Sequence, residues 1–144
     1  MPKPEITEFT EFTYAYSITD NMMNGALPCA VGIPLFPSLQ QEGKLSGGYD
    51  VEIPRSSFPV FLQYKIPQVM VKRSRKTPDA FTAPYYRMHL RAPKISTQHE
   101  SLLTHELGGR AVYYVVPHFH TAHELRSRYT HKKIPEGSAF IRPS

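Results

Sequence analysis

Asp50, Gln63 and Lys65 are the residues of this chain whose types and spacing could do chemistry. They lie on two short hydrophobic stretches, residues 48–53 and 60–66, that predict a β-hairpin. Side chains alternate between the two faces of a strand, so Gln63 and Lys65 share one face. A carboxylate, an amide oxygen and an ammonium at one end of a small sheet could hold a divalent cation and a phosphate group.

The register of the expected hairpin decides whether these groups meet. If Ile53 pairs with Val60 across a short loop, Asp50 lies opposite Gln63. The side chains of this pair then project from the same face of the sheet. The sequence therefore predicts that Asp50, Gln63 and Lys65 converge on one side.

An acidic residue on one strand, followed about a dozen residues later by Gln-x-Lys, resembles the site pattern of the PD-(D/E)xK nuclease superfamily. The closer resemblance is to the Q-x-K variant of Mrr-like restriction endonucleases. Asp50 and Gln63-Tyr64-Lys65 match the pattern, and two glycines precede the first strand. The resemblance covers roughly the central third of the chain. It implies a metal-dependent nuclease that hydrolyses phosphodiester bonds, with DNA as the expected substrate and Mg²⁺ or Mn²⁺ as the cofactor.

The resemblance also implies a role for each matched residue. Asp50 would be the main metal ligand, the amide oxygen of Gln63 a weaker neutral ligand, and the backbone carbonyl of Tyr64 a further one. Lys65 would orient the attacking water or stabilise the anionic transition state. A glutamate on the first helix often completes the site in this family, and Glu11 is the candidate here. A solvated acidic first turn explains Glu11 equally well.

Positive charge is concentrated around the expected hairpin. The chain carries a net charge of +5, and residues 44–94 contain ten Lys and Arg against three Asp and Glu. This uneven distribution predicts a polyanionic partner, with nucleic acid as the expected one. The candidates for contacts with phosphate groups are Lys72, Arg73, Arg75, Lys76 and Arg87.

A different function class is compatible with the same residues. The solvent face of a hairpin commonly carries Asp, Gln and Lys, so the chain could be a non-catalytic nucleic-acid-binding or protein-assembly module on a degenerate nuclease fold. Tyrosines beside basic residues can bind single-stranded nucleic acid in such a module. The chain has no evident target-recognition segment, so a homodimer or a partner subunit is expected in either case.

Three histidines form a second group that could bind metal. His118, His120 and His123 have the spacing His-x-His-x-x-His, and the first two share strand parity. Zinc binds such trios, but no cysteine or clear fourth ligand accompanies them. Surface or helix-capping histidines are the alternative.

Length and composition bound the class of protein. The 144 residues are 40% hydrophobic and 20% charged, which predicts one globular domain over residues 1–144. The single cysteine, Cys29, excludes an internal disulfide and fits a reducing compartment. The N-terminus lacks the apolar core of a signal peptide, and no apolar run approaches the length of a membrane span. A cytoplasmic location without a membrane partner is expected.

The order of elements predicts an α/β or α+β single-domain sandwich, with a central mixed β-sheet flanked by helices, of the restriction-endonuclease-like kind. Phe9, Phe12, Tyr16 and Ile18 recur near helical spacing and predict the first helix. Capping boxes start the later helices. Helices are expected within residues 7–23, from 98 to the glycines at 108 and 109, and from 121 to about 129; strands are expected at 48–53, 60–66, 85–90, 111–116 and 138–142.

Overall fold

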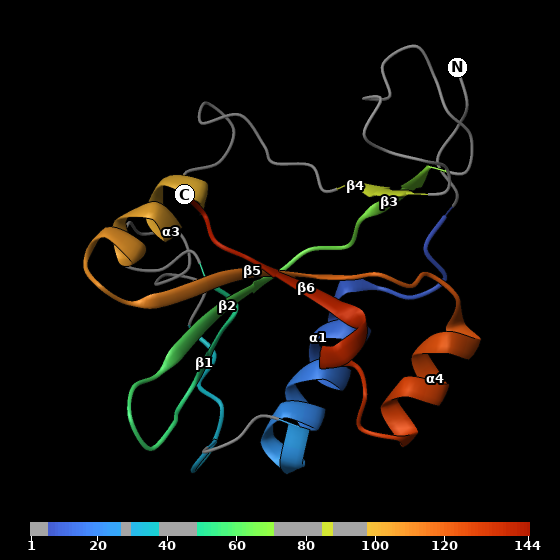
Figure 1. The fold of residues 1–144 in the computed structure, drawn as a ribbon, viewed down its shortest axis with the longest axis horizontal. Coiled ribbons are helices and arrows are strands. Elements are labelled where there is room, and N and C mark those ends of the chain that lie inside the picture. Colours follow the sequence, from blue (N-terminus) through green and yellow to red (C-terminus); the bar gives the residue numbers. More distant parts are fainter. Residues whose placement is uncertain (1–5, 27–29, 38–48, 71–84, 88–97) are drawn as a thin grey trace.

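The computed structural model describes residues 6–26, 30–37, 49–70, 85–87 and 98–144 (Figure 1). Its helices are α1 (Glu11–Asn21), α3 (Gln98–Leu107) and α4 (Ala122–Thr130), with short helical turns η1 (Met22–Ala26) and η2 (Pro135–Gly137). Its strands are β1 (Val51–Ile53), β2 (Val60–Tyr64), β3 (Gln68–Met70), β4 (Tyr85–Arg87), β5 (Ala111–Pro117) and β6 (Ser138–Ile141).

Four of the strands form one mixed sheet in the order β1-β2-β5-β6. The pairs β1–β2 and β5–β6 are antiparallel, and the central pair β2–β5 is parallel. A parallel pair needs a long crossover connection, and α3 lies within that connection. The predicted mixed α/β class with a central sheet flanked by helices is therefore confirmed.

The described part of the expected strand at residues 85–90 does not join this sheet. Its described part, β4, pairs antiparallel with β3 in a separate two-stranded sheet. Pro67 lies between β2 and β3, and a proline has no N–H to donate to a sheet. The chain therefore leaves the main sheet after β2, and the extra strand is displaced from the core.

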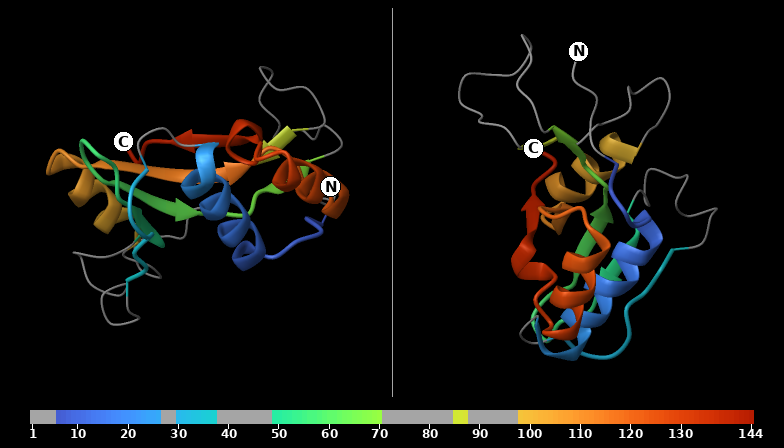
Figure 2. Two further views of the ribbon diagram at one scale, coloured as in Figure 1. Left: turned by 90° about the horizontal axis from the view of Figure 1, so that it is seen from below. Right: turned by 90° about the vertical axis from the view of Figure 1, so that its right-hand side faces the viewer.

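Helices cover both faces of the sheet (Figure 2). Helices α1 and α4 pack on one face, where Ile18 of α1 and Leu125 of α4 share a hydrophobic cluster with Leu62. Helix α3 packs on the other face, where its Leu102 meets Phe61. The two faces are called the α1 face and the α3 face below.

The buried face of α1 differs from the predicted one. Tyr14 and Ile18 are fully buried, whereas Phe12 is 82% exposed and Tyr16 is 62% exposed. The N-cap residue Thr10 accepts a hydrogen bond on its side-chain oxygen from the N–H of Thr13 at 3.1 Å, and the helix lies within the predicted residues 7–23. The spacing of Phe12 and Tyr16 pointed to the wrong stripe of the helix, because a second apolar stripe, Tyr14 with Ile18, runs beside it and is the one that packs on the sheet.

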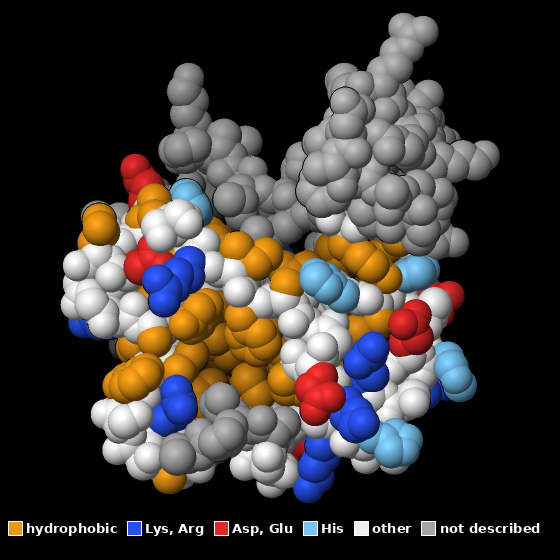
Figure 3. Space-filling model, viewed as in Figure 1, with side chains coloured by type: hydrophobic (Ala, Val, Ile, Leu, Met, Phe, Trp, Pro, Cys, Tyr) orange, Lys and Arg blue, Asp and Glu red, His pale blue; other side chains and the backbone are white. Residues whose placement is uncertain are grey.

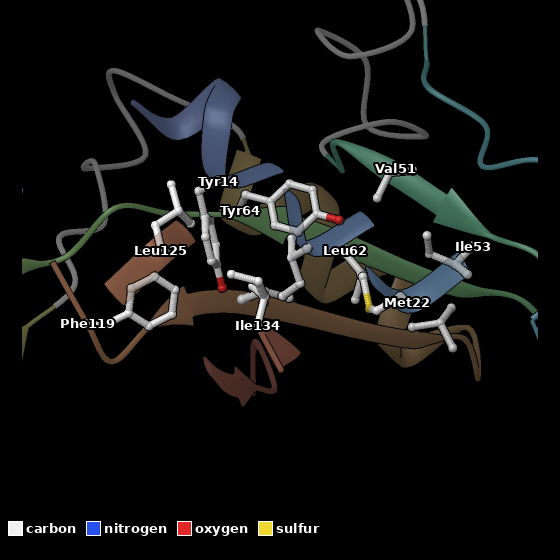
Figure 4. Packing of buried hydrophobic residues seen from close by; sticks show 12 residues of the cluster. Tyr14, Met22, Val51, Ile53, Leu62, Tyr64, Phe119, Leu125 and Ile134 are labelled. Atoms are coloured by element: carbon white, nitrogen blue, oxygen red, sulfur yellow. The ribbon is translucent and has the colours of Figure 1, made fainter. Parts of the chain in front are cut away.

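Two hydroxyl groups tie α1 to the sheet through the core (Figure 4). The Tyr14 hydroxyl donates to Ser138 Oγ at 2.7 Å, and the Tyr64 hydroxyl lies 2.7 Å from Thr19 Oγ1. Buried polar groups without a partner cost free energy, so these bonds select one position of the helix.

A part of the α1 face is left open. Hydrophobic side chains gather in a hollow on the side of the molecule shown in Figure 3. A hollow of about 180 Å³ at this part of the sheet is lined by Met22, Arg55, Phe58, Val60, Leu62, Ala111, Tyr113 and Phe140.

In the described part of the chain, no helix has both the length and the apolar character needed to cross a membrane.

The free energy of unfolding should fall as the pH rises above about 10, the ordinary pKa of tyrosine. Burial raises the pKa of Tyr14 and Tyr64 well above that value and raises the pKa of Tyr114 to about 12. These phenols ionise in the unfolded chain before they ionise in the folded one. The stability they contribute is therefore complete below pH ~10 and is lost as the pH rises further. Urea unfolding at several pH values between about 8 and 11 measures the slope.

The Tyr64→Phe variant should show a smaller slope, by a difference that grows through pH ~10 toward the limit of about 1.4 kcal/mol per pH unit for one phenol. The lost bond to Thr19 lowers stability equally at each pH and does not change the slope. Tyr14→Phe is the matched second variant. A slope equal to that of the wild type in both variants would contradict the assignment of the alkaline instability to these phenols.

Candidate metal and phosphodiester site

The hairpin register is the predicted one, with Ile53 opposite Val60 and Val51 opposite Leu62. One residue earlier the ladder is irregular. The N–H of Asp50 donates to the carbonyl of Leu62 at 2.8 Å, although Leu62 already pairs with Val51. Two residues of one strand thus oppose one residue of the other, which is the geometry of a β-bulge.

The bulge breaks the alternation of side chains at Asp50. Val51 packs in the cluster of the α1 face, yet Tyr49 packs against Phe61 on the α3 face, with ring centroids 4.9 Å apart. In a regular strand, Tyr49 and Val51 would share a face. Asp50 is the residue between them, and it lines a pocket on the α1 face.

The Asp50 carboxylate is held at the end of β2. Its Oδ2 accepts a hydrogen bond from the backbone N–H of Tyr64 at 2.8 Å. Tyr64 is the central residue of Gln63-Tyr64-Lys65, so Asp50 contacts this sequence at the Tyr64 N–H and not at the side chains of Gln63 or Lys65. The contact runs through the backbone of β2.

Glu11 reaches the same pocket from the first turn of α1. The pocket has a volume of about 500 Å³, and its lining combines the two carboxylates with four aromatic rings and small apolar side chains. The lining residues are Glu11, Phe12, Ala15, Tyr16, Phe36, Pro37, Asp50 and Tyr64. The structure therefore brings together Asp50, Tyr64 and Glu11, three of the predicted site residues.

Gln63 and Lys65 are directed elsewhere, which corrects the expectation of a single common face. Both share strand parity with Phe61, and the Lys65 ammonium donates to Gln98 Oε1 at 2.8 Å, at the start of α3. The reason for the correction is the bulge, which turns Asp50 to the α1 face while the regular strand β2 keeps Gln63 and Lys65 on the α3 face.

Gln63 is almost fully buried, at 2% exposure. Its Nε2 donates to the carbonyl of Tyr64 at 3.4 Å, and its Oε1 is buried without a hydrogen-bond partner in the part of the chain that the structure describes. A buried acceptor of this kind calls for an explanation, and a role as a ligand to a cation is one.

The three histidines are not assembled into a metal site. The ring of His118 stacks on Tyr86 at 5.8 Å, His120 Nδ1 lies 3.2 Å from the Tyr86 hydroxyl, and His123 is exposed on α4. Among the described residues, no group of three or more His, Cys, Asp and Glu side chains is arranged to hold a metal ion. A cation beside Glu11 and Asp50 would thus need further oxygen ligands from amide or backbone carbonyl groups.

Most of the predicted phosphate-binding residues are not described. Lys72, Arg73, Arg75 and Lys76 lie outside the described residues, and Arg87 is placed on β4 by its backbone alone. Sequence reasoning missed the exposed aromatic residues Phe12, Tyr16 and Phe36 of the pocket. The signal that could have found the first two is the helical row of Tyr14 and Ile18, which leaves Phe12 and Tyr16 on the outer side of α1.

The chain matches no protein-family model, and no curated protein or solved structure matches it.

A divalent cation should bind in the Glu11–Asp50 pocket. Isothermal titration with Mn²⁺ should give saturable binding to the wild-type protein. Asp50→Asn should weaken it on the order of tenfold or more, because hard cations need charged oxygen ligands. The amide keeps an oxygen that can accept the bond from the Tyr64 N–H, so the local structure is retained.

Glu52→Gln is the matched control, since Glu52 lies on the same hairpin and does not line the pocket. This variant should bind Mn²⁺ as the wild type does. Equal weakening by Asp50→Asn and Glu52→Gln, or no binding to the wild type, would argue against a metal site at this pocket.

Proposed function

We propose that this protein is a metal-dependent nuclease that hydrolyses phosphodiester bonds, with DNA as its substrate. The observation that carries the proposal is the meeting of Glu11, Asp50 and Tyr64, the central residue of Gln63-Tyr64-Lys65, at one end of β2. These are the same residues to which the resemblance to the Q-x-K nucleases gives a role in the site.

The donor set fits a hard divalent cation such as Mg²⁺ or Mn²⁺. The pocket offers two carboxylates, and such cations prefer oxygen ligands. Asp50, with support from Glu11 and the carbonyl of Tyr64, would hold the cation. The resemblance would make Gln63 a neutral ligand, but its side chain lies on the α3 face, opposite this pocket, so the assignment of ligands is confined to Asp50, Glu11 and the Tyr64 carbonyl. When bound, the metal would supply Lewis acidity and lower the pKa of a water molecule.

The protein's own groups contribute orientation and charge. The Tyr64 N–H fixes one oxygen of Asp50, so this carboxylate is positioned before any ligand arrives. Lys65 directly follows Tyr64 in the chain, and its ammonium donates a hydrogen bond to Gln98 on the α3 face. The resemblance gives Lys65 the role of stabilising the negative charge that develops on the phosphate oxygens, and this role requires its ammonium to leave Gln98 and reach the end of β2 from the α3 face.

The arrangement of elements supports a restriction-endonuclease-like fold. A helix, an antiparallel hairpin, a crossover helix and a strand parallel to the second hairpin strand follow one another as α1, β1–β2, α3 and β5. The αββ–αβ core of the resembled superfamily has this order. The displaced β3–β4 pair is an addition to that core.

The second candidate is a non-catalytic module that binds nucleic acid or assembles with another protein. The open hydrophobic hollow on the α1 face favours it, because it exposes Phe58 and Phe140 beside the edge strand β6. Such a surface also suits the homodimer or partner subunit expected for so short a nuclease.

The purified protein should cleave plasmid and single-stranded DNA in the presence of Mg²⁺ or Mn²⁺. Asp50→Ala should abolish cleavage because it removes the carboxylate that Tyr64 holds in place. Lys65→Ala should lower the rate on the order of 10²–10³-fold, the effect of removing one donor that stabilises a transition state. Gel assays of the cleaved fraction over time give the rates.

Lys133→Ala, which removes an exposed ammonium in the segment that follows α4, is the matched control and should cleave as the wild type does. Circular dichroism should show that each variant is folded. Full activity in both Asp50→Ala and Lys65→Ala would refute the assignment. An inactive wild-type protein that still binds DNA would favour the non-catalytic module.

Affinity for nucleic acid should fall steeply as salt is added. Each phosphate that the protein neutralises releases counterions and contributes about 0.7 to 0.9 to the slope of log K against log salt. Replacing Arg73, Arg75 and Lys76 by alanine should therefore reduce the slope by about two to three. Fluorescence anisotropy with a labelled oligonucleotide measures it. A slope near zero in the wild type would exclude phosphate contacts as the source of binding.

A further inference from the structure

Three large aromatic side chains are exposed around the two carboxylates of the pocket. Phe12 is 82% exposed, Tyr16 62% and Phe36 63%, and all three line the pocket that contains Glu11 and Asp50. Phenylalanine is among the residues most often buried. Exposed rings gathered at one pocket therefore mark a surface that a ligand covers.

Two separate elements hold these rings. Phe12 and Tyr16 are four residues apart on α1, which places them on the same stripe of the helix, away from the core residue Tyr14. Phe36 follows Leu35, whose backbone exchanges two hydrogen bonds with Glu52 of β1, at 2.8 and 2.9 Å. The segment with residues 30–37 thus runs along β1 and forms a second wall (Figure 2).

The rings are available for stacking. No contact joins Phe12 or Phe36 to another aromatic ring within the described part of the chain, although many core rings pair with one another. A base could therefore stack on Phe12 or Phe36 without displacing another aromatic side chain of the protein. Stacking of bases on aromatic side chains contributes about 1–3 kcal/mol per base and tolerates any sequence.

We propose that the pocket binds unpaired nucleobases on Phe12, Tyr16 and Phe36, so that the substrate is single-stranded DNA or an unpaired segment of a duplex. The inference rests on the proposed nuclease function and specifies its substrate. A base in a duplex is stacked on both faces by its neighbours, whereas an unpaired base can offer a face to a protein ring. The pocket, at about 500 Å³, has the volume of a small-ligand site.

Charge explains why stacking is needed at this position. Without a bound cation, the carboxylates of Glu11 and Asp50 give a phosphate group no attraction at the pocket wall. The net charge of +5 attracts a polyanion to the protein as a whole, and the aromatic rings then hold its bases beside the carboxylates. Long-range attraction by the net charge and local stacking on the rings together bring a phosphodiester bond to the two carboxylates.

The test compares single-stranded and duplex binding in aromatic variants. The probes are a fluorescent single-stranded oligonucleotide and the same sequence as a blunt duplex, titrated in Ca²⁺ and followed by anisotropy, with oligonucleotide length checked on a gel afterwards. Phe12→Ala and Phe36→Ala should each weaken single-strand binding by about 5- to 150-fold, the equivalent of one lost stack. Duplex binding should be unchanged.

Two further variants separate stacking from other effects. Phe12→Trp keeps an aromatic face and should retain most of the single-strand affinity. Leu107→Ala removes an apolar side chain of comparable exposure, 87%, that lies on α3 outside this pocket, and it should bind as the wild type does. All these positions are exposed, so the variants should unfold at the same midpoint temperature as the wild-type protein, as followed by circular dichroism.

The outcomes distinguish this inference from the proposed function. The inference would be overturned if Phe12→Ala and Phe36→Ala kept the single-strand affinity of the wild type, or if they lost duplex affinity equally. In either case, cleavage that still depends on Asp50 would leave the nuclease proposal standing. Single-strand binding that requires Phe12, in a protein that cleaves no DNA, would support the stacking surface and overturn the nuclease proposal.

Discussion

The parallel pairing of β2 with β5 is the constraint on which the rest of the structure depends. The pair runs from Val60–Ala111 to Tyr64–Val115 in the middle of the sheet, and both faces are covered by helices. A parallel pair requires a crossover, which puts α3 on one face and leaves the other to α1 and α4. The end of β2, where Gln63-Tyr64-Lys65 lies, is consequently enclosed by a helix on each side.

The position of α1 follows from buried polar groups as much as from apolar contact. Apolar packing alone is non-directional, and it would allow the helix to rotate by a fraction of a turn. The hydroxyls of Tyr14 and Tyr64 remove this freedom, because each has one partner, Ser138 Oγ and Thr19 Oγ1, in the core. Their bonds turn Glu11 toward the pocket and leave Phe12 outside the core. The same contacts that stabilise the fold thus shape the candidate site.

A one-residue irregularity determines which groups share that site. The bulge at Asp50 costs one regular hydrogen-bonded pair of the ladder, and the Asp50 carboxylate offsets this cost by accepting the Tyr64 N–H. In a regular hairpin Asp50 would lie with Gln63 and Lys65. With the bulge it lies with Glu11, so two carboxylates gather on the α1 face while Lys65 is held by Gln98 on the α3 face. Bulges often re-aim a side chain in this way near functional sites.

The sequence by itself determined the elements that depend on local chemistry and on hydrophobic periodicity. The register Ile53–Val60, the start of α4 at its Thr121 cap and the buried strand β5 were all predictable, because each is specified by residues close together in the chain. Only the tertiary structure decided which way Asp50 turns, which stripe of α1 is buried, and that β4 pairs with β3. These features depend on contacts between residues far apart in sequence, where a shift of one residue or a partial turn of a helix exchanges a buried face for an exposed one.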